Sequence, residues 1–481
     1  MAASAVYDNI MGTMPDPSLF RFPPTGQPAP LAPAPTQLSL MRPFNIPDHI
    51  FAAALDAKVP LTIATLYAVT VKALNWYNAS RNKKPWAVSK ARPFFAFVVL
   101  HNVFLALYSA WTFWGMLGGM RRSIVPPTGP GGLAATIDSF CRLQGPPGLG
   151  ASLYYNETSA GWRSADPAAL ASALDAGRPS NSQMGRIWNE GLAYYGWIFY
   201  LSKFYEVLDT FIILAKGKYS STLQTYHHAG AMMCMWAGMR YMSAPIWLFV
   251  LYNSFIHSLM YTYYTLTAFS VKVPMGVKRL LTSLQITQFL VGAAYAMAHS
   301  FVTYMAAVTV TRPAPEPVDV VSPVGSAIPV ASGIFRSVRN LLFGSAPVMD
   351  TSVVAVARVR QPTMITETVN VAQPCIVTTG ETFAIWLNVL YLAPLTYLFV
   401  SFFIASYVKR SNASHKMNGK THRRESNVTL AEKAGWDAAR SVEREVYGDD
   451  NRASGDASGS ASGSASELTP KKANGRTKRR A

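Results

Sequence analysis

The sequence predicts an all-α integral membrane protein with seven transmembrane helices. Three observations lead to this fold class. Half of the 481 residues are hydrophobic, and the mean hydropathy is +0.15. Only 14% of the residues are charged, whereas a soluble domain usually carries about 25%. Several apolar stretches also approach about 20 residues, the length with which a helix crosses a bilayer.

Seven stretches are candidates for these spans. They cover residues 59–76, 93–120, 191–215, 229–242, 245–269, 280–304 and 383–408. The first is the weakest, because Lys72 lies near its end. The fourth is too short to cross a bilayer as a helix, unless it begins near Thr222.

The basic residues predict how these spans are oriented. Lys and Arg gather after the first, third, fifth and seventh stretches, and such residues mark cytoplasmic loops. They are Arg81, Lys83, Lys84, Lys90 and Arg92, then Lys216 and Lys218, then Lys272, Lys278 and Arg279, and finally Lys409 and Arg410. These segments share one side only if the N-terminus is luminal and the C-terminus is cytosolic. The net charge of +18 does not indicate nucleic acid, because the basic residues do not interleave with aromatic ones.

Three regions follow from this topology. Residues 1–50 form an N-terminal luminal segment that we expect to be partly disordered, and residues 51–410 form the seven-span domain. Residues 411–481 form a cytosolic, basic, low-complexity tail. The domain carries two luminal insertions, 121–190 and 305–381, which are rich in Pro, Gly, Ala and Ser. The N-terminus lacks a basic region followed by an apolar core, so no cleavable signal peptide is predicted.

The two luminal insertions carry candidates for covalent modification. Cys141 lies in the first and Cys375 in the second, and an oxidising lumen permits a disulfide between them. We hypothesise that bond, with two unpaired thiols as the alternative. Asn156 begins an Asn-Glu-Thr glycosylation sequon on the luminal side, and an unused sequon is the alternative. The third cysteine, Cys234, lies within the fourth span, so there is no paired-cysteine metal site.

Polar side chains inside the spans indicate a functional site, because they are costly in hydrocarbon. Lys203, Glu206 and Asp209 in the third span are three residues apart and share one helix face. An ion-pair staple between helices is the structural alternative. The further polar residues are Gln224, His227, His228, Asn253, His257, Tyr261, Tyr264, Gln285 and Gln288. One membrane histidine is more often a packing residue, but four helices that each turn a polar stripe inward are not explained in that way.

Three other classes of membrane protein fit parts of this pattern. A di-iron desaturase needs several histidine boxes, but among the eight histidines only His227 and His228 form a cluster, and Gln224 stands where a third ligand would be. We therefore predict no metal. A retinal protein needs a Schiff-base lysine in the last span, and residues 383–408 contain none. A transporter or binding protein stays open on the polar stripes alone.

The polar stripes resemble the boxes of the ELO family of very-long-chain fatty acid elongases, the 3-ketoacyl-CoA synthases. Four boxes match in order, KxxExxDT at 203–210, QxxHH at 224–228, NxxxHxxMYxYY at 253–264 and TxxQxxQ at 282–288. His101-Asn102 and Thr382-Phe383-Ala384 also resemble family positions. The resemblance covers about residues 93–300, and it leaves out the N-terminal 50 residues, the second insertion and the tail. The family's second box begins with His where this chain has Gln224, a departure that concerns the substrate more than the reaction class.

The resemblance implies an enzyme of the endoplasmic reticulum membrane that condenses a long acyl-CoA with malonyl-CoA and needs no cofactor. Spans two to seven would enclose a tunnel for the substrate. The implied partners are the two CoA thioesters, membrane lipid, and the reductases and dehydratase of the elongation cycle, with no nucleic acid. A homodimer stays open. The end of the chain, Lys478-Arg479-Arg480-Ala481, resembles a dibasic retrieval signal of the endoplasmic reticulum.

The resemblance also implies roles for the box residues. His227 would accept the acyl group as an acyl-imidazole, and His257, held by Asn253, would transfer a proton or stabilise the enolate. The alternative exchanges these two histidines. His228 would orient its neighbours, while Glu206 and Asp209 would set the protonation of the histidines.

The substrate-binding candidates form a second set. They are Lys203, Gln224, Tyr261, Tyr264, Gln285, Gln288, Lys216 and Arg279. Lys203 would also balance the charges of Glu206 and Asp209. The glutamines would hydrogen-bond the thioester or pantetheine, and Lys216 and Arg279 would bind CoA phosphates. For the cations, simple topological charge is the alternative. A non-catalytic lipid-binding or scaffold protein of the same fold is the alternative function.

Overall fold

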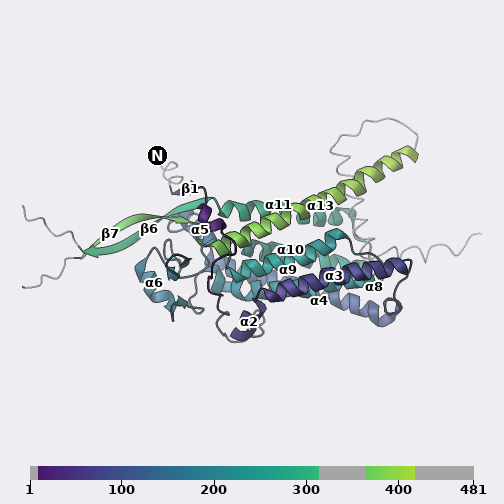
Figure 1. Ribbon diagram of the computed structural model, residues 1–481, viewed down its shortest axis with the longest axis horizontal. Coiled ribbons are helices and arrows are strands. Elements are labelled where there is room, and N and C mark those ends of the chain that lie inside the picture. The colour runs from purple at the N-terminus through teal and green to yellow at the C-terminus, as the bar shows by residue number, and fades with distance from the viewer. Residues whose placement is uncertain (1–8, 314–363, 418–481) are drawn as a thin grey trace, which may run out of the picture.

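The computed structural model describes residues 9–313 and 364–417, and most of them are helical. Figure 1 shows long helices packed side by side, with strands gathered at one end. The helices are η1 (Pro17–Phe20), α2 (Asp48–Ala54), α3 (Lys58–Ser80), η2 (Ala87–Lys90), α4 (Arg92–Ser123), α5 (Gly132–Cys141), α6 (Pro167–Ala173), η3 (Trp188–Gly196), α7 (Trp197–Tyr205), α8 (Val207–Ala215), α9 (Thr222–Arg240), α10 (Ile246–Ala268), α11 (Met275–His299) and α13 (Thr379–Met417).

Each of the seven predicted stretches coincides with helical structure, with two differences. The third is not one helix, because it is divided into η3, α7 and α8, and Glu206 stands at the junction between the last two. The sixth ends at His299, and a strand begins at Val302. The fourth begins at Thr222, the start that its length required.

Among the described residues, three helical segments are long and apolar enough to cross a membrane, namely Arg92–Ser123, Leu280–His299 and Thr379–Val400. A fourth candidate is the pair α2 and α3, which is bent by 50°. The segments that do not qualify are the broken helix α7–α8, α9 and α10, which carry most of the predicted polar site. Polar side chains that face one another inside a bundle lower the hydropathy of the helices that carry them. The count of seven spans therefore stays a prediction.

The predicted cytoplasmic loops meet at one end of the bundle. The backbone N–H of Trp86 donates to Ala215 O at 2.9 Å, and the side-chain amide of Asn78 donates to Lys218 O at 2.9 Å. The rings of Phe95 and Phe269 lie 6.1 Å apart. Loops 81–91, 216–221 and 269–274, which we call the basic end, thus lie together although they are far apart in the sequence.

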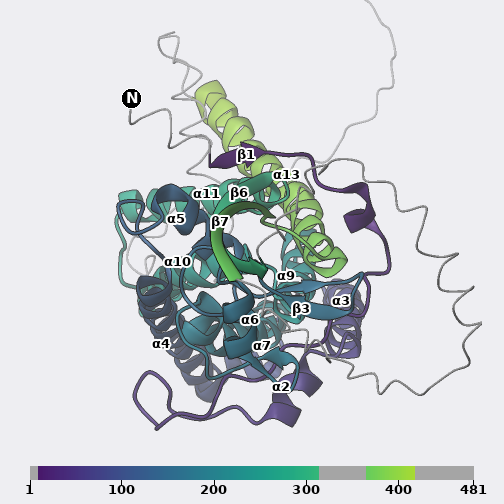
Figure 2. The same ribbon diagram turned by 90° about the vertical axis from the view of Figure 1, so that its left-hand side faces the viewer.

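The opposite end is covered by the two predicted insertions, as Figure 2 shows. The bundle has the predicted all-α character, whereas the insertions contribute short sheets. The strands are β1 (Ile10–Gly12), β2 (Tyr154–Asn156), β3 (Gly161–Arg163), β4 (Leu174–Asp175), β5 (Arg178–Pro179), β6 (Val302–Pro313) and β7 (Met364–Pro374). Strands β6 and β7 pair in antiparallel register from Thr303↔Pro374 to Pro313↔Met364 and project from the bundle in Figure 1. Both are rich in Val and Thr, residues that favour strands.

A buried polar network holds this covering, which we call the cap (residues 124–187 with β6 and β7). Asp138 accepts a 2.7 Å hydrogen bond from Arg186 Nη2 and another from the hydroxyl of Tyr304. Burial raises the pKa of the Tyr304 hydroxyl above its ordinary value, so this hydroxyl keeps its proton and acts as the donor. The network joins the first insertion to the second, in addition to a disulfide between Cys141 and Cys375.

The N-terminal segment, for which we expected partial disorder, packs against the bundle from residue 9 onward. Strand β1 extends the sheet through Ile10↔Tyr304. Along η3, tyrosine hydroxyls donate to backbone carbonyls of the segment, from Tyr195 to Met41 O at 2.8 Å and from Tyr194 to Phe44 O at 3.0 Å. These hydroxyls satisfy two backbone carbonyls of the segment.

Candidate active site

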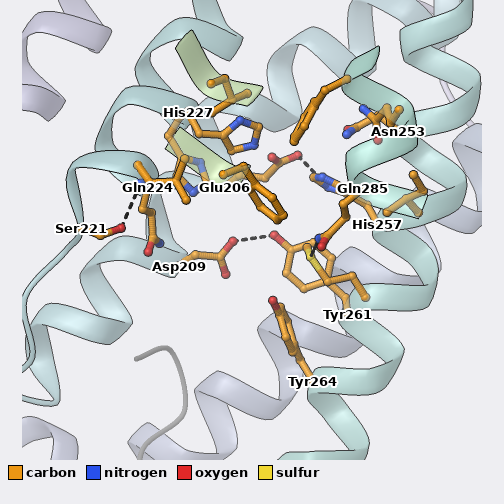
Figure 3. A pocket seen from close by; sticks show the side chains of 18 residues that line it. Glu206, Asp209, Ser221, Gln224, His227, Asn253, His257, Tyr261, Tyr264 and Gln285 are labelled. Atoms are coloured by element: carbon orange, nitrogen blue, oxygen red, sulfur yellow. Dashed lines mark hydrogen bonds and ion pairs between the residues drawn. The ribbon is translucent and has the colours of Figure 1, made fainter. Parts of the chain in front are cut away.

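One cavity gathers most of the predicted site residues (Figure 3). It has about 1080 Å³ of unfilled space, part of which opens to the outside. The lining residues are Glu206, Asp209, Ser221, Leu223, Gln224, His227, His228, Asn253, Ile256, His257, Met260, Tyr261, Tyr264, Gln285, Gln288, Phe289, Leu395 and Phe399. They come from α8 with the residue that precedes it, the α8–α9 loop, α9, α10, α11 and α13. All six catalytic candidates and five of the eight substrate-binding candidates are among them.

Three candidates do not line this cavity. Lys203 lies behind its wall, in contact with Glu206. Lys216 follows α8 at the basic end, away from the polar wall. Arg279 is part of α11, and its side chain lies outside the described residues.

Lys203 and Glu206 form a buried ion pair with an Nζ–Oε1 distance of 2.7 Å. The same carboxylate oxygen accepts a hydrogen bond from Ser202 Oγ at 3.0 Å, and Lys203 Nζ also donates to Asn253 Oδ1 on α10 at 3.1 Å. Lys203 is 4% exposed and Glu206 is 3% exposed, so both charges depend on these partners. The ion pair lies within the third span, the Lys203–Asn253 hydrogen bond joins it to α10, and the Glu206 carboxylate also reaches the cavity.

His257 faces this carboxylate across the cavity wall. Its Nδ1 lies 3.7 Å from Glu206 Oε1, and Figure 3 draws this ion pair. The expectation that Asn253 holds His257 is not met by a hydrogen bond in the structure, where the Asn253 carbonyl oxygen accepts from Lys203 instead. A spacing of four places both residues on one helix face, but it does not determine which atoms bond.

The two adjacent histidines of α9 have different surroundings, as expected for neighbours about 100° apart on a helix. His227 Nδ1 lies 2.9 Å from the hydroxyl of Tyr391 on α13. The ring of His228 packs edge-on against Tyr67 of α3, with centroids 6.1 Å apart. Tyr391 was missed from the sequence, although Asn388, three residues earlier on the same helix, is a polar neighbour that could have marked it.

Asp209 is the centre of a second polar group. Its Oδ1 lies 2.8 Å from His101 Nε2, and its Oδ2 accepts a 2.5 Å hydrogen bond from the Tyr261 hydroxyl. The hydroxyl of Tyr205 lies 3.3 Å from the other ring nitrogen of His101. We expected Asp209 to act on the box histidines, yet its histidine partner comes from α4. His101 resembled a family position but was otherwise isolated in the sequence.

Two of the three glutamine candidates have protein partners. Gln224 Nε2 donates to Thr210 Oγ1 at 3.2 Å, and Gln285 Nε2 points at Met260 Sδ, 3.4 Å away. Another part of the cavity wall is apolar. Its residues were not predicted from the sequence, because apolar side chains are ordinary in a membrane span. They are Leu223, Ile256, Phe289, Leu395 and Phe399. The cavity therefore combines one polar wall with a surface suited to hydrocarbon.

The other predicted features lie away from the cavity. The structure places Cys141 and Cys375 in a disulfide in the cap, with their Cα atoms 4.8 Å apart. Asn156 ends β2, where its Oδ1 accepts a hydrogen bond from the Ser159 N–H at 2.9 Å. Within residues 9–313 and 364–417, no three His, Cys, Asp or Glu side chains are grouped so that they could hold a metal ion.

The fold and the site define a helical membrane protein with a histidine- and carboxylate-bearing wall in a largely apolar cavity. The model of the ELO family (GNS1/SUR4 family) matches residues 53–415, and the chain belongs to this family. No solved structure gives a significant match.

Several curated relatives match a shorter segment. The chain is 37% identical over 105 residues to human "Very long chain fatty acid elongase 3", which is 22% of this chain and 39% of the relative. It is 39% identical over 116 residues to "Fatty acid elongase sre1" of Dictyostelium discoideum, or 24% and 41% of the two chains. For mouse "Very long chain fatty acid elongase 4" the values are 40% over 98 residues, or 19% and 31%. The match thus spans less than half the length of these relatives.

Proposed function

We propose that this chain is a very-long-chain 3-oxoacyl-CoA synthase, the condensing enzyme of fatty acid elongation. It would convert acyl-CoA and malonyl-CoA to 3-oxoacyl-CoA, CO2 and CoA. One observation carries the proposal: His227, His228 and His257 line the same cavity as Glu206, beside an apolar wall. The printed names of the relatives, which are fatty acid elongases, support it. A scaffold would not need this set of groups.

The two faces of the cavity suggest how a long acyl-CoA binds. The acyl chain fits the apolar wall formed by Phe289, Leu395 and Phe399, as in a predicted tunnel closed at the cap. The anionic CoA head would stay at the basic end, where Lys216 and Lys272 could bind its phosphates. Arg279, whose side chain lies outside the described residues, keeps the same predicted role. The acyl chain of the acyl-CoA would enter the cavity between the helices.

His227 would carry the acyl group in the first half-reaction. A ring nitrogen attacks the thioester carbon, a C–N bond forms, and the C–S bond breaks. CoA leaves as the thiol after it takes up the imidazole proton, so the products are an acyl-imidazole and free CoA. Cys234, the one cysteine outside the disulfide, does not line the cavity and is not needed.

His257 would act in the second half-reaction. Malonyl-CoA loses CO2, and the electron pair of the broken C–C bond stays on the enolate of the remaining thioester. The enolate carbon attacks the acyl carbon, a C–C bond forms, the C–N bond to His227 breaks, and the imidazole regains a proton from water. Glu206 near Nδ1 would stabilise a protonated His257 ring, whose other N–H would then donate a hydrogen bond to the enolate oxygen.

The proposed setting is the endoplasmic reticulum, with seven spans, a luminal N-terminus and a cytosolic basic end. The meeting of the three basic loops at one end of the bundle supports this topology. The later reductions and the dehydration would need separate enzymes as partners. Both reacting carbons are supplied by the two CoA thioesters, so the proposed reaction uses no cofactor.

The condensation is tested with purified membranes that contain this protein. They are incubated with labelled malonyl-CoA and a panel of long and very long acyl-CoAs, saturated and polyunsaturated, without NADPH. Wild type should form labelled 3-oxoacyl-CoA, and His227→Ala should lower the rate by at least about 100-fold. The exposed His49→Ala serves as the matched control and should keep the wild-type rate. No product from folded wild type would contradict the proposal and favour a lipid-binding scaffold.

The roles of the two histidines are separated by omitting malonyl-CoA. Acyl-CoA alone should leave an acyl adduct on His227, which peptide mass spectrometry can locate. An adduct on His257 instead would exchange the two roles. Stoichiometric CoA release without any histidine adduct would reject covalent catalysis.

A further inference from the structure

We infer that Tyr391 is a positioning residue for His227, because its hydroxyl fixes the imidazole in the tautomer with the proton on Nδ1. Nε2 then presents its lone pair for attack on the thioester. The inference rests on the proposed function, in which His227 is the nucleophile, and it assigns the control of that nucleophile to α13.

The hydroxyl of Tyr391 makes two contacts with His227. It donates to the backbone carbonyl oxygen of His227 at 3.0 Å, and it lies 2.9 Å from Nδ1 of the same residue. A phenol has one proton to donate. Since the carbonyl accepts that proton, the Tyr391 oxygen meets Nδ1 with a lone pair, and Nδ1 must be the donor. A neutral imidazole with its proton on Nδ1 is unprotonated at Nε2.

The first turns of α9 form a seat for the Tyr391 ring. A Cβ placed on Gly230 would overlap the ring atoms of Tyr391, so only glycine permits this approach. The ring of Tyr226 stacks on that of Tyr391 with centroids 5.5 Å apart, and the Tyr226 hydroxyl donates to Tyr391 O at 3.2 Å. Tyr226, His227 and Gly230 lie within about one turn of the helix. The close approach at Gly230, the Tyr226 ring and the Tyr226 hydroxyl therefore hold the Tyr391 hydroxyl against Nδ1 of His227.

The position of Tyr391 in α13 links this control to the wall of the cavity. Leu395 and Phe399, one and two turns further along the same helix, line the cavity. Pro394 lies between them and Tyr391 and has no N–H to offer the preceding turn. A single helix thus forms part of the apolar wall and orients the proposed nucleophile.

The first test removes only the hydroxyl. Tyr391→Phe keeps the ring, its stacking on Tyr226 and its place over Gly230. We expect kcat to fall about 10- to 100-fold, as for loss of a group that orients a reacting side chain. The KM for acyl-CoA should stay within about twofold, because no interaction with bound substrate is lost. Tyr397→Phe, at an exposed position of the same helix, is the matched control and should change kcat by less than about threefold.

The second test measures the chemical reactivity of the His227 imidazole without the enzymatic reaction. Membranes are treated with diethyl pyrocarbonate, which acylates an unprotonated imidazole nitrogen, and modified peptides are followed by mass spectrometry. The rate of modification scales with the fraction of His227 that has its proton on Nδ1 and a lone pair on Nε2. Tyr391→Phe should therefore slow modification of His227 at least about threefold. Modification of the exposed His49 should stay unchanged.

The two tests separate this inference from the proposed function. If wild type forms no 3-oxoacyl product but His227 modification still depends on the Tyr391 hydroxyl, the proposed function fails and the tautomer assignment stands. If Tyr391→Phe keeps the wild-type kcat and the wild-type modification rate, the inference is overturned.

Discussion

Lys203 and Glu206 are two charged side chains that are almost fully buried. Each has the other as a partner at 2.7 Å, and Asn253 and Ser202 supply the remaining hydrogen bonds. A buried pair of this kind contributes little net stability compared with an apolar pair, but either charge left alone is strongly destabilising. The reason to retain it is therefore its effect on the cavity, where Glu206 faces His257.

We predict that Lys203→Met lowers the free energy of unfolding by about 3–5 kcal/mol, because it leaves Glu206 buried without its cation. The double variant Lys203→Met with Glu206→Gln should recover most of that loss, since no unpaired charge remains. Condensation should stay low in both variants. The measurement is thermal unfolding in detergent micelles, paired with the labelled malonyl-CoA assay.

Two results would contradict this account. If the double variant is as unstable as Lys203→Met, the cost does not come from an unpaired charge. If the double variant regains wild-type activity together with its stability, the pair has only the structural role of joining α7 to α10.

Helix α9 carries the QxxHH box, and its first turn is fixed by Ser221. The Ser221 hydroxyl accepts a hydrogen bond from the Gln224 N–H at 3.2 Å, which satisfies one of the free N–H groups at the start of the helix. Gln224 in turn donates to Thr210 on α8. The Ser221 hydroxyl thus fixes the start of α9, and the Gln224–Thr210 hydrogen bond holds the QxxHH box against α8.

We predict that Ser221→Ala lowers the free energy of unfolding by about 1 kcal/mol, whereas Ser221→Asp keeps it near the wild-type value because Asp also caps. Thr262→Ala, at an exposed position in the middle of α10, is the comparison and should change stability by less than about 0.5 kcal/mol. Thermal unfolding in micelles measures all three. Equal losses for Ser221→Ala and Ser221→Asp would mean that capping is not the source of the effect.

The disulfide in the cap joins positions 234 residues apart. It links the end of α5 to the segment just before α13, and the Asp138 network joins the same two insertions. Neither cysteine lines the cavity. A covalent link of this span restricts the unfolded chain as a whole, so its effect belongs to stability more than to chemistry.

We predict that Cys141→Ser together with Cys375→Ser lowers the free energy of unfolding by about 5.5 kcal/mol on the chain-entropy model. The kcat of the protein that stays folded at low temperature should be close to that of wild type. Non-reducing peptide mapping of wild type tests the bond itself. Two free thiols there would remove the basis of this prediction, and an unchanged melting temperature in the double variant would show that the bond does not stabilise the fold.

Much of the candidate site could be predicted from helical spacing. Residues three or four apart on one helix share a face. This is why three same-helix pairs line the cavity, namely Glu206 with Asp209, Gln224 with His227, and Asn253 with His257. The same rule could not identify Tyr391 or the pairing of His101 with Asp209, because those contacts join helices that are distant in the sequence. It also could not show that Asn253 bonds Lys203 rather than His257.

The sequence by itself determined the helical class, the order of the boxes and which face of each helix is polar, since these depend on local periodicity. Only the tertiary structure decided the rotation of α13 that places Tyr391 on His227, the break of the third span at Glu206, and the strands that extend from the cap. The physical reason is that local spacing fixes directions along one helix. The partner atom across the interface is selected by how whole helices pack, and a single small residue such as Gly230 can decide how closely they approach.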